Sequence, residues 1–74
     1  MTVDEFLERL TDAIEAESPL RPGQALDSAA VWDSLAVLAV VDLFDEIGAD
    51  ADLDTIGRAV TTDDLVALAG GALS

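Results

Sequence analysis

The 74-residue chain contains no cysteine, no histidine and no tyrosine, and its three positively charged residues are all arginines. Without cysteine the chain can form no disulfide, no thiol nucleophile and no Cys-ligated metal site. Without histidine, a Ser-His-Asp triad, a histidine base and a His-ligated metal are excluded too. A catalytic domain that lacks these side chains and lysine would have few groups able to perform chemistry.

Long apolar runs are also missing. The longest uninterrupted run extends from Leu35 to Val41, far short of the roughly 20 residues that a membrane-spanning helix needs. The first residues, Met1 to Glu5, are acidic and open a predicted helix, so we expect no signal peptide. These features predict a soluble, cytoplasmic protein without a membrane partner.

Sixteen acidic residues against three arginines give a net charge of −13. Such a surface repels nucleic acid and steers the protein toward basic partners. The same acidity can also serve only to keep a small domain soluble. At this length we expect a single domain over residues 1–74, a monomer with a modest core that buries about 60% of its unfolded surface.

The hydrophobic pattern predicts an all-α fold: a small four-helix bundle of three main helices and one short helix, with a long first loop. The first helix is predicted from Thr2 to about Glu17, because Thr2 and Glu5 have capping-box spacing and Pro19 stops the helix. The long loop, Ser18 to Trp32, would be pinned to the bundle by three spaced apolar residues, namely Leu20, Leu26 and Val31.

After a connector from Gly48 to Asp52, a short helix is predicted from Leu53 to Ala59, with Leu53 and Ile56 pointing inward. Gly57 weakens this helix by about 1 kcal/mol relative to alanine. Thr61 then caps the last helix, with Asp64 at the third helical position, and Gly70-Gly71 ends it.

The central helix is predicted from about Ser34 to Ile47, with Asp33 or Ser34 as its cap and Gly48 as its stop. At about 100° per residue, one arc forms a predicted buried stripe bordered by Leu43; it consists of Val37, Val40, Val41, Phe44 and Ile47. The opposite side carries a predicted partner-contact surface made of Leu35, Leu38, Asp42, Asp45 and Glu46. The alternative is that isolated exposed leucines are common and have no function.

The motif Asp33-Ser34-Leu35, which opens an apolar helix at mid-chain, resembles the attachment motif of acyl carrier proteins. The helix order, the acidity and the second signature, Thr61 to Leu65, fit the same family over nearly the whole chain. The resemblance implies that Ser34 carries a 4′-phosphopantetheine arm transferred from coenzyme A by a phosphopantetheinyl transferase. It implies that Asp33 helps this transferase to bind magnesium and activate the hydroxyl, and that Leu35 is a surface contact.

The family role implied is that of a discrete carrier, not an enzyme. Its arm would hold acyl or aminoacyl thioesters between the loading and processing enzymes of fatty acid, polyketide or nonribosomal peptide synthesis. The residue Trp32 before the motif resembles discrete carriers of specialised pathways. One departure is that Ala36 and Ala39 stand where familiar carriers often place acids, which bears on which transferase and partner enzymes accept this protein.

Other interpretations of the same residues remain open. From the residues alone, Ser34 is a plain helix cap, and the chain is an acidic helical interaction module without a prosthetic group. Ser28 follows an aspartate but lacks the leucine and the helix, which favours an ordinary turn or cap residue. Trp32 either stacks on a ligand or, as burial favours, anchors the loop to the bundle.

The acidic run from Asp50 to Asp54 invites a comparison with calcium-binding loops, which place oxygen ligands at positions 1, 3 and 5. Thr55 stands where such a loop needs glycine, and Thr61 where it needs glutamate. A degenerate calcium-binding domain is therefore the weakest alternative, and no metal site is expected.

Overall fold

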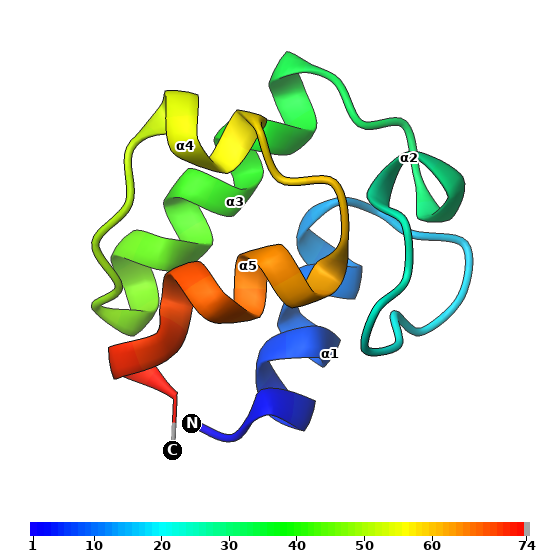
Figure 1. Cartoon of the computed structure of the whole chain (residues 1–74). Helices are drawn as coiled ribbons and strands as arrows, with labels where there is room; N and C mark the ends of the chain where they lie inside the picture. Colours follow the sequence, from blue (N-terminus) through cyan, green and yellow to red (C-terminus); the bar gives the residue numbers. More distant parts are fainter. Residues whose placement is uncertain (74) are drawn as a thin grey trace.

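The computed structural model describes residues 1–73 and confirms the all-α fold. The helices are α1 (Val3–Ala13), α2 (Leu26–Ala29), α3 (Ser34–Ile47), α4 (Leu53–Gly57) and α5 (Thr62–Ala69), followed by a 3₁₀ turn over Gly70–Ala72. Figure 1 shows α4 lying alongside α3, while α2 sits apart within the long first connection. Residues 1–73 contain no strand, only one isolated antiparallel bridge between Ala25 and Thr61.

The core lies where α1, α3 and α5 meet. Phe6 of α1 and Phe44 of α3 are both buried, and their rings meet edge to face with centroids 5.9 Å apart. Fully burying one such apolar side chain contributes about 1.5–3 kcal/mol. Leucine, valine and isoleucine side chains complete the fully buried centre, namely Leu10, Leu26, Val40, Ile56 and Leu65.

Three of the predicted helix ends are confirmed. Thr2 and Glu5 form a reciprocal capping box at the start of α1, and Thr61 and Asp64 form a second one at the start of α5. Each box satisfies two amide donors that a helix start otherwise leaves free. Gly48 ends α3 with φ +78°, a left-handed conformation that glycine adopts without steric cost.

The first helix is shorter than predicted, because it ends at Ala13 and not near Glu17. Glu15 takes a left-handed φ of +54°, which turns the chain back. The Ala16 amide closes this turn by donating to the Thr11 carbonyl at 3.0 Å. The Thr11 hydroxyl also accepts a hydrogen bond from the Leu20 amide at 3.1 Å, and Leu20 is buried against the core.

The long first connection is partly helical, which the sequence did not predict. Leu20 and Leu26 are buried as predicted, but Val31 is exposed, so its predicted role as a pin is wrong. Backbone hydrogen bonds hold the connection instead. The Leu26 amide donates to the Val60 carbonyl, and the Thr62 amide to the Gln24 carbonyl, each at 2.9 Å.

The buried face of α3 differs in part from the predicted stripe. Val37, Val40 and Phe44 are buried as predicted, whereas Val41 and Ile47 are only partly buried. Ala36 and Leu43 are buried in addition, because α1 packs on that side of α3. The buried arc is thus rotated toward α1, and the face beside Ser34 stays open to solvent.

In the short helix α4, Ile56 is fully buried as predicted, but Leu53 is half exposed and the predicted inward placement is wrong. Asp52 caps α4 by accepting a hydrogen bond from the Thr55 amide at 2.8 Å. This start leaves Leu53 at the edge of the surface, and α4 ends at Gly57, two residues before Ala59.

Candidate functional site

Ser34 is the first residue of α3, and the cap is Asp33. The Asp33 carboxylate accepts a hydrogen bond from the Ala36 amide at 3.0 Å. The interpretation of Ser34 as a plain capping serine is therefore wrong, because its neighbour performs that task. Within residues 1–73, the exposed Ser34 hydroxyl makes no hydrogen bond. This hydroxyl lies at the N-terminal, positive end of the α3 dipole.

The backbone around Ser34 suits a bound anion. The Ala36 amide is occupied by Asp33, and the Val37 amide donates to the Asp33 carbonyl at 3.0 Å. The amides of Ser34 and Leu35 have no partner within the described part of the chain. Unpaired amides at a helix start are suited to a phosphate oxygen.

An open groove of about 600 Å³ adjoins Ser34 and runs between α3 and α4. We call it the α3–α4 groove. It is lined by Trp32, Asp33, Ser34, Val37 and Leu38 from one side and by Leu53, Asp54, Gly57 and Arg58 from α4. The sequence did not predict that α4 forms this wall, because a five-residue helix contains no pattern that shows which neighbouring element its exposed side will face.

Exposed apolar side chains lie in two hollows near Ser34. A smaller hollow of about 240 Å³ shares Asp33 with the groove and includes Val31 and Leu35. Val31 and Leu35 are 77% and 75% exposed, and Leu38 and Leu53 of the groove are 48% and 50% exposed. We call these four residues the apolar collar. Exposed apolar side chains that gather near one residue are a candidate contact surface.

The predicted partner-contact residues are all exposed on α3: Leu35, Leu38, Asp42, Asp45 and Glu46. They do not form one uniform patch. The leucines lie near Ser34, while Asp42 and Glu46 border a shallow hollow beside α1 that also includes Arg9. Glu46 pairs with the Arg9 guanidinium at 3.6 Å, so part of its charge is neutralised.

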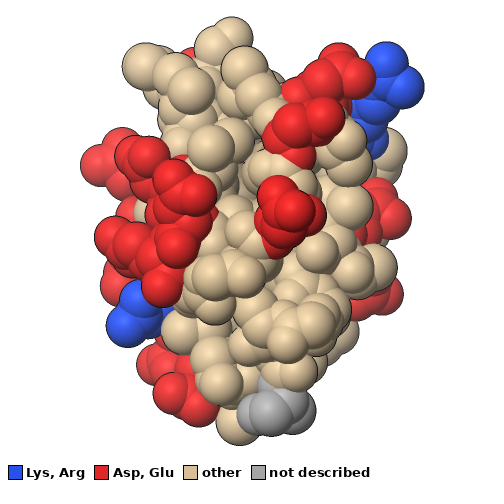
Figure 2. All heavy atoms as spheres, turned by 90° about the vertical axis from the view of Figure 1, so that its left-hand side faces the viewer, with Lys and Arg blue, Asp and Glu red and all other residues tan. Residues whose placement is uncertain are grey.

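On the side of the molecule where α3 and α4 lie, most charged side chains are carboxylates (Figure 2). Figure 2 shows them in separate groups with uncharged surface between them and a cationic side chain at each outer edge. This arrangement combines apolar contact area with a negative field that attracts a basic surface.

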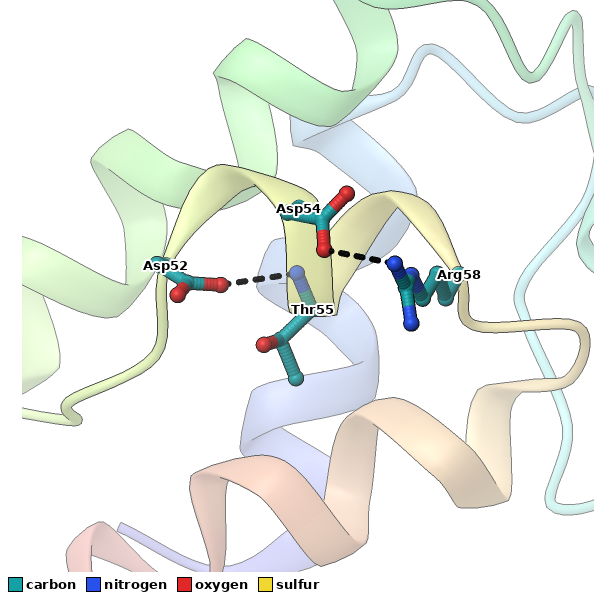
Figure 3. A network of polar contacts seen from close by, with 4 residues as sticks. All are labelled: Asp52, Asp54, Thr55 and Arg58. Carbon is teal, nitrogen blue, oxygen red and sulfur yellow. Dashed lines mark hydrogen bonds and ion pairs between the residues drawn. The ribbon is translucent and has the colours of Figure 1, made fainter.

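The exposed side of α4 carries a small polar network (Figure 3). Hydrogen bonds from the Thr55 side chain and amide hold the pKa of Asp52 below its ordinary value of 3.8. Asp54 and Arg58 form an ion pair at 3.1 Å, one helical turn apart. Within residues 1–73, no group of three or more acidic side chains is arranged to hold a metal ion.

Trp32 is partly buried and packs against the core, which supports the interpretation as a loop anchor. It also lines the α3–α4 groove, and its indole Nε1 is a buried donor without a hydrogen-bond partner. Ser28, by contrast, lies inside the four-residue helix α2 and is exposed there. Ser28 does not line the α3–α4 groove.

No family model, curated protein or solved structure matches this chain. In the described residues, no helix is long and apolar enough to cross a membrane.

Proposed function

We propose that this chain is a discrete acyl carrier protein whose 4′-phosphopantetheine arm is attached to Ser34. The observation that carries the proposal is the state of the Ser34 side chain: exposed, without a hydrogen bond, and placed at the first position of α3 by the Asp33 cap. The apolar collar near Ser34 offers contact area to the enzymes that must reach the arm.

The residues present fit the attachment chemistry. A phosphopantetheinyl transferase would direct the Ser34 oxygen onto the β-phosphorus of coenzyme A, so that a phosphodiester forms and 3′,5′-ADP leaves with the bridging oxygen. The hydroxyl proton would pass to a base of the transferase, since the chain has no histidine to act as one. One Asp33 oxygen caps the helix, and the other is available to the magnesium ion of the transferase.

The chain itself performs no bond-making in this proposal. When bound, the arm supplies a terminal thiol that holds acyl or aminoacyl groups as thioesters. The contribution of the chain is to present Ser34 at an exposed helix start and to offer the apolar collar and the acids of α3 to loading and processing enzymes.

The test is the intact mass of the protein after incubation with coenzyme A, magnesium and a broad-specificity transferase. The unaltered chain and Ser28→Ala should each gain one phosphopantetheine, and Ser34→Ala should gain none. Ser28→Ala is a matched control, because Ser28 also follows an aspartate and is exposed. Modification of Ser34→Ala would overturn the site assignment.

A second candidate is an acidic helical interaction module that never receives an arm. The Arg9–Glu46 pair and the apolar collar are compatible with this candidate, because both could belong to a docking surface whether or not Ser34 is modified. An unaltered chain that gains no mass, under conditions where a known carrier is fully modified, would select this candidate.

A further inference from the structure

Among residues 1–73, Arg58 is the only cation that lines the α3–α4 groove with Ser34. The other two arginines are elsewhere: Arg9 pairs with Glu46, and Arg21 lies in the long first connection. In a chain of charge −13, an anion attached to Ser34 would meet mostly repulsion. Arg58 is therefore the one positively charged side chain of the groove that can offset this repulsion.

We propose that Arg58 exchanges partners when Ser34 is modified, leaving Asp54 and pairing with the phosphodiester. This inference rests on the proposed attachment at Ser34. It assigns to Arg58 a positioning role, in which the guanidinium holds the base of the arm against α4.

The present partner of Arg58 is easily released. The Asp54–Arg58 pair is exposed, with 74% and 80% of the two side chains accessible to solvent. Exposed pairs one helical turn apart contribute little stability, because water screens them and both side chains lose freedom. Figure 3 shows this pair as separate from the start of α4, where Asp52 accepts a hydrogen bond from the Thr55 amide.

The phosphodiester is the stronger partner for two reasons. Its two non-bridging oxygens share one negative charge and match the planar guanidinium, which can donate two parallel hydrogen bonds. The unpaired amides of Ser34 and Leu35 stabilise the same anion at the helix start.

The two carboxylates that line the groove, Asp33 and Asp54, oppose the exchange only weakly. Asp33 repels the phosphodiester, but its charge is partly offset by the hydrogen bond from the Ala36 amide. Asp54 loses its partner, yet its side chain is already mostly in solvent and can turn outward. Neither carboxylate is buried, so neither imposes the cost of an unpaired charge in the core.

The test follows the Nε–H signal of Arg58 in ¹H–¹⁵N spectra of the chain before and after enzymatic modification, with intact mass confirming the modified state. Before modification, Asp54→Asn should shift the Arg58 signal, because it removes the partner. After modification, the unaltered chain should show a shifted signal, and Asp54→Asn should then have little further effect. Asp50→Asn is the control, because it removes the same charge from a neighbouring exposed site without touching the pair.

A second measurement separates positioning from a mere change of environment. Modification should raise the Tm of the unaltered chain, and Arg58→Gln should abolish most of that rise. A fully modified chain whose Arg58 signal stays in place and still responds to Asp54→Asn would overturn the exchange while leaving the function intact. A chain that gains no mass would refute the proposed function first, and the exchange with it.

Discussion

Replacing Thr62 by valine tests how the long first connection is held in place. Among residues 1–73, Thr62 is the one polar residue that is fully buried. Its hydroxyl donates to the Arg21 carbonyl at 2.6 Å and accepts from the Gln24 amide at 3.2 Å. Thr62→Val keeps the shape of the side chain and removes both hydrogen bonds.

The expected cost follows from the two backbone groups left behind. The Gln24 amide keeps a turn contact with the Arg21 carbonyl at 3.2 Å, and Arg21 is exposed, so water can replace part of what is lost. A buried group that loses its partner costs about 1–3 kcal/mol, and we expect about 2 kcal/mol here. For a domain of this size that corresponds to a fall in Tm of about 8–16 °C.

The assay is thermal and urea unfolding followed by circular dichroism, with Thr62→Ser as the matched control. Serine keeps the hydroxyl and removes one methyl group, which should cost only about 0.8 kcal/mol. The valine variant should therefore be the less stable of the two. If Thr62→Val melts with the unaltered chain, or if Thr62→Ser is the less stable variant, the hydrogen bonds do not hold the connection.

Three further predictions concern charge and the partner-contact surface. Raising NaCl from about 0.01 M to about 0.15 M shortens the screening length from roughly 30 Å to roughly 8 Å. That length is less than the 17 Å of the shortest dimension of the molecule, so the repulsion among carboxylates weakens and the Tm should rise. An unchanged or lower Tm would show that self-repulsion is not limiting. Amide hydrogen bonds from Val60 and then Thr61 lower the pKa of Asp64, so its contribution to stability is complete above the ordinary value of 3.8 and is lost as the pH falls through the lowered pKa. Asp64→Ala should thus lower the Tm at neutral pH and progressively less as the pH falls below 3.8, and an equal loss at neutral and at acidic pH would contradict this. Leu38→Ala should weaken binding of the modified protein to a cognate partner enzyme by about 1–2 kcal/mol. Asp42→Lys should slow association in a salt-dependent way. Glu46→Lys should slow association less, because Arg9 already neutralises part of the Glu46 charge. Folded variants with unchanged binding kinetics would show that the contact surface lies elsewhere.

The features predicted correctly from the sequence are those that depend on neighbours within one helical turn. The capping boxes at Thr2 and Thr61 and the glycine stop at Gly48 are local devices, and all three are confirmed. The end of α1 was misplaced, because the chain turns at Glu15, which has a left-handed φ, and returns to contact Thr11 through Leu20. The helical pattern of the first residues contains no signal for either feature.

Within the candidate site, the exposed positions on α3 were predicted correctly from the sequence and those contributed by α4 were not. The helical period of α3 correctly predicted that Leu35 and Leu38 are exposed beside Ser34. It could not supply the opposite wall of the groove, which α4 contributes from about twenty residues later. Leu53 and Arg58 reach that wall only because the burial of Ile56 fixes the rotation of α4. A five-residue helix has too few positions to define its own buried face.

The net negative charge and the apolar collar act together on how this chain associates with other molecules. Four exposed large apolar side chains near one serine would normally invite two copies to associate through them. Two copies that each carry −13 repel one another as they approach, which opposes such association. A partner with a basic surface would meet the opposite field and gain from both charge and apolar contact. In the proposed carrier role, this surface would select partners by charge before contact and add affinity by burial afterwards, which is the order a small protein needs if it must visit several enzymes and leave each one.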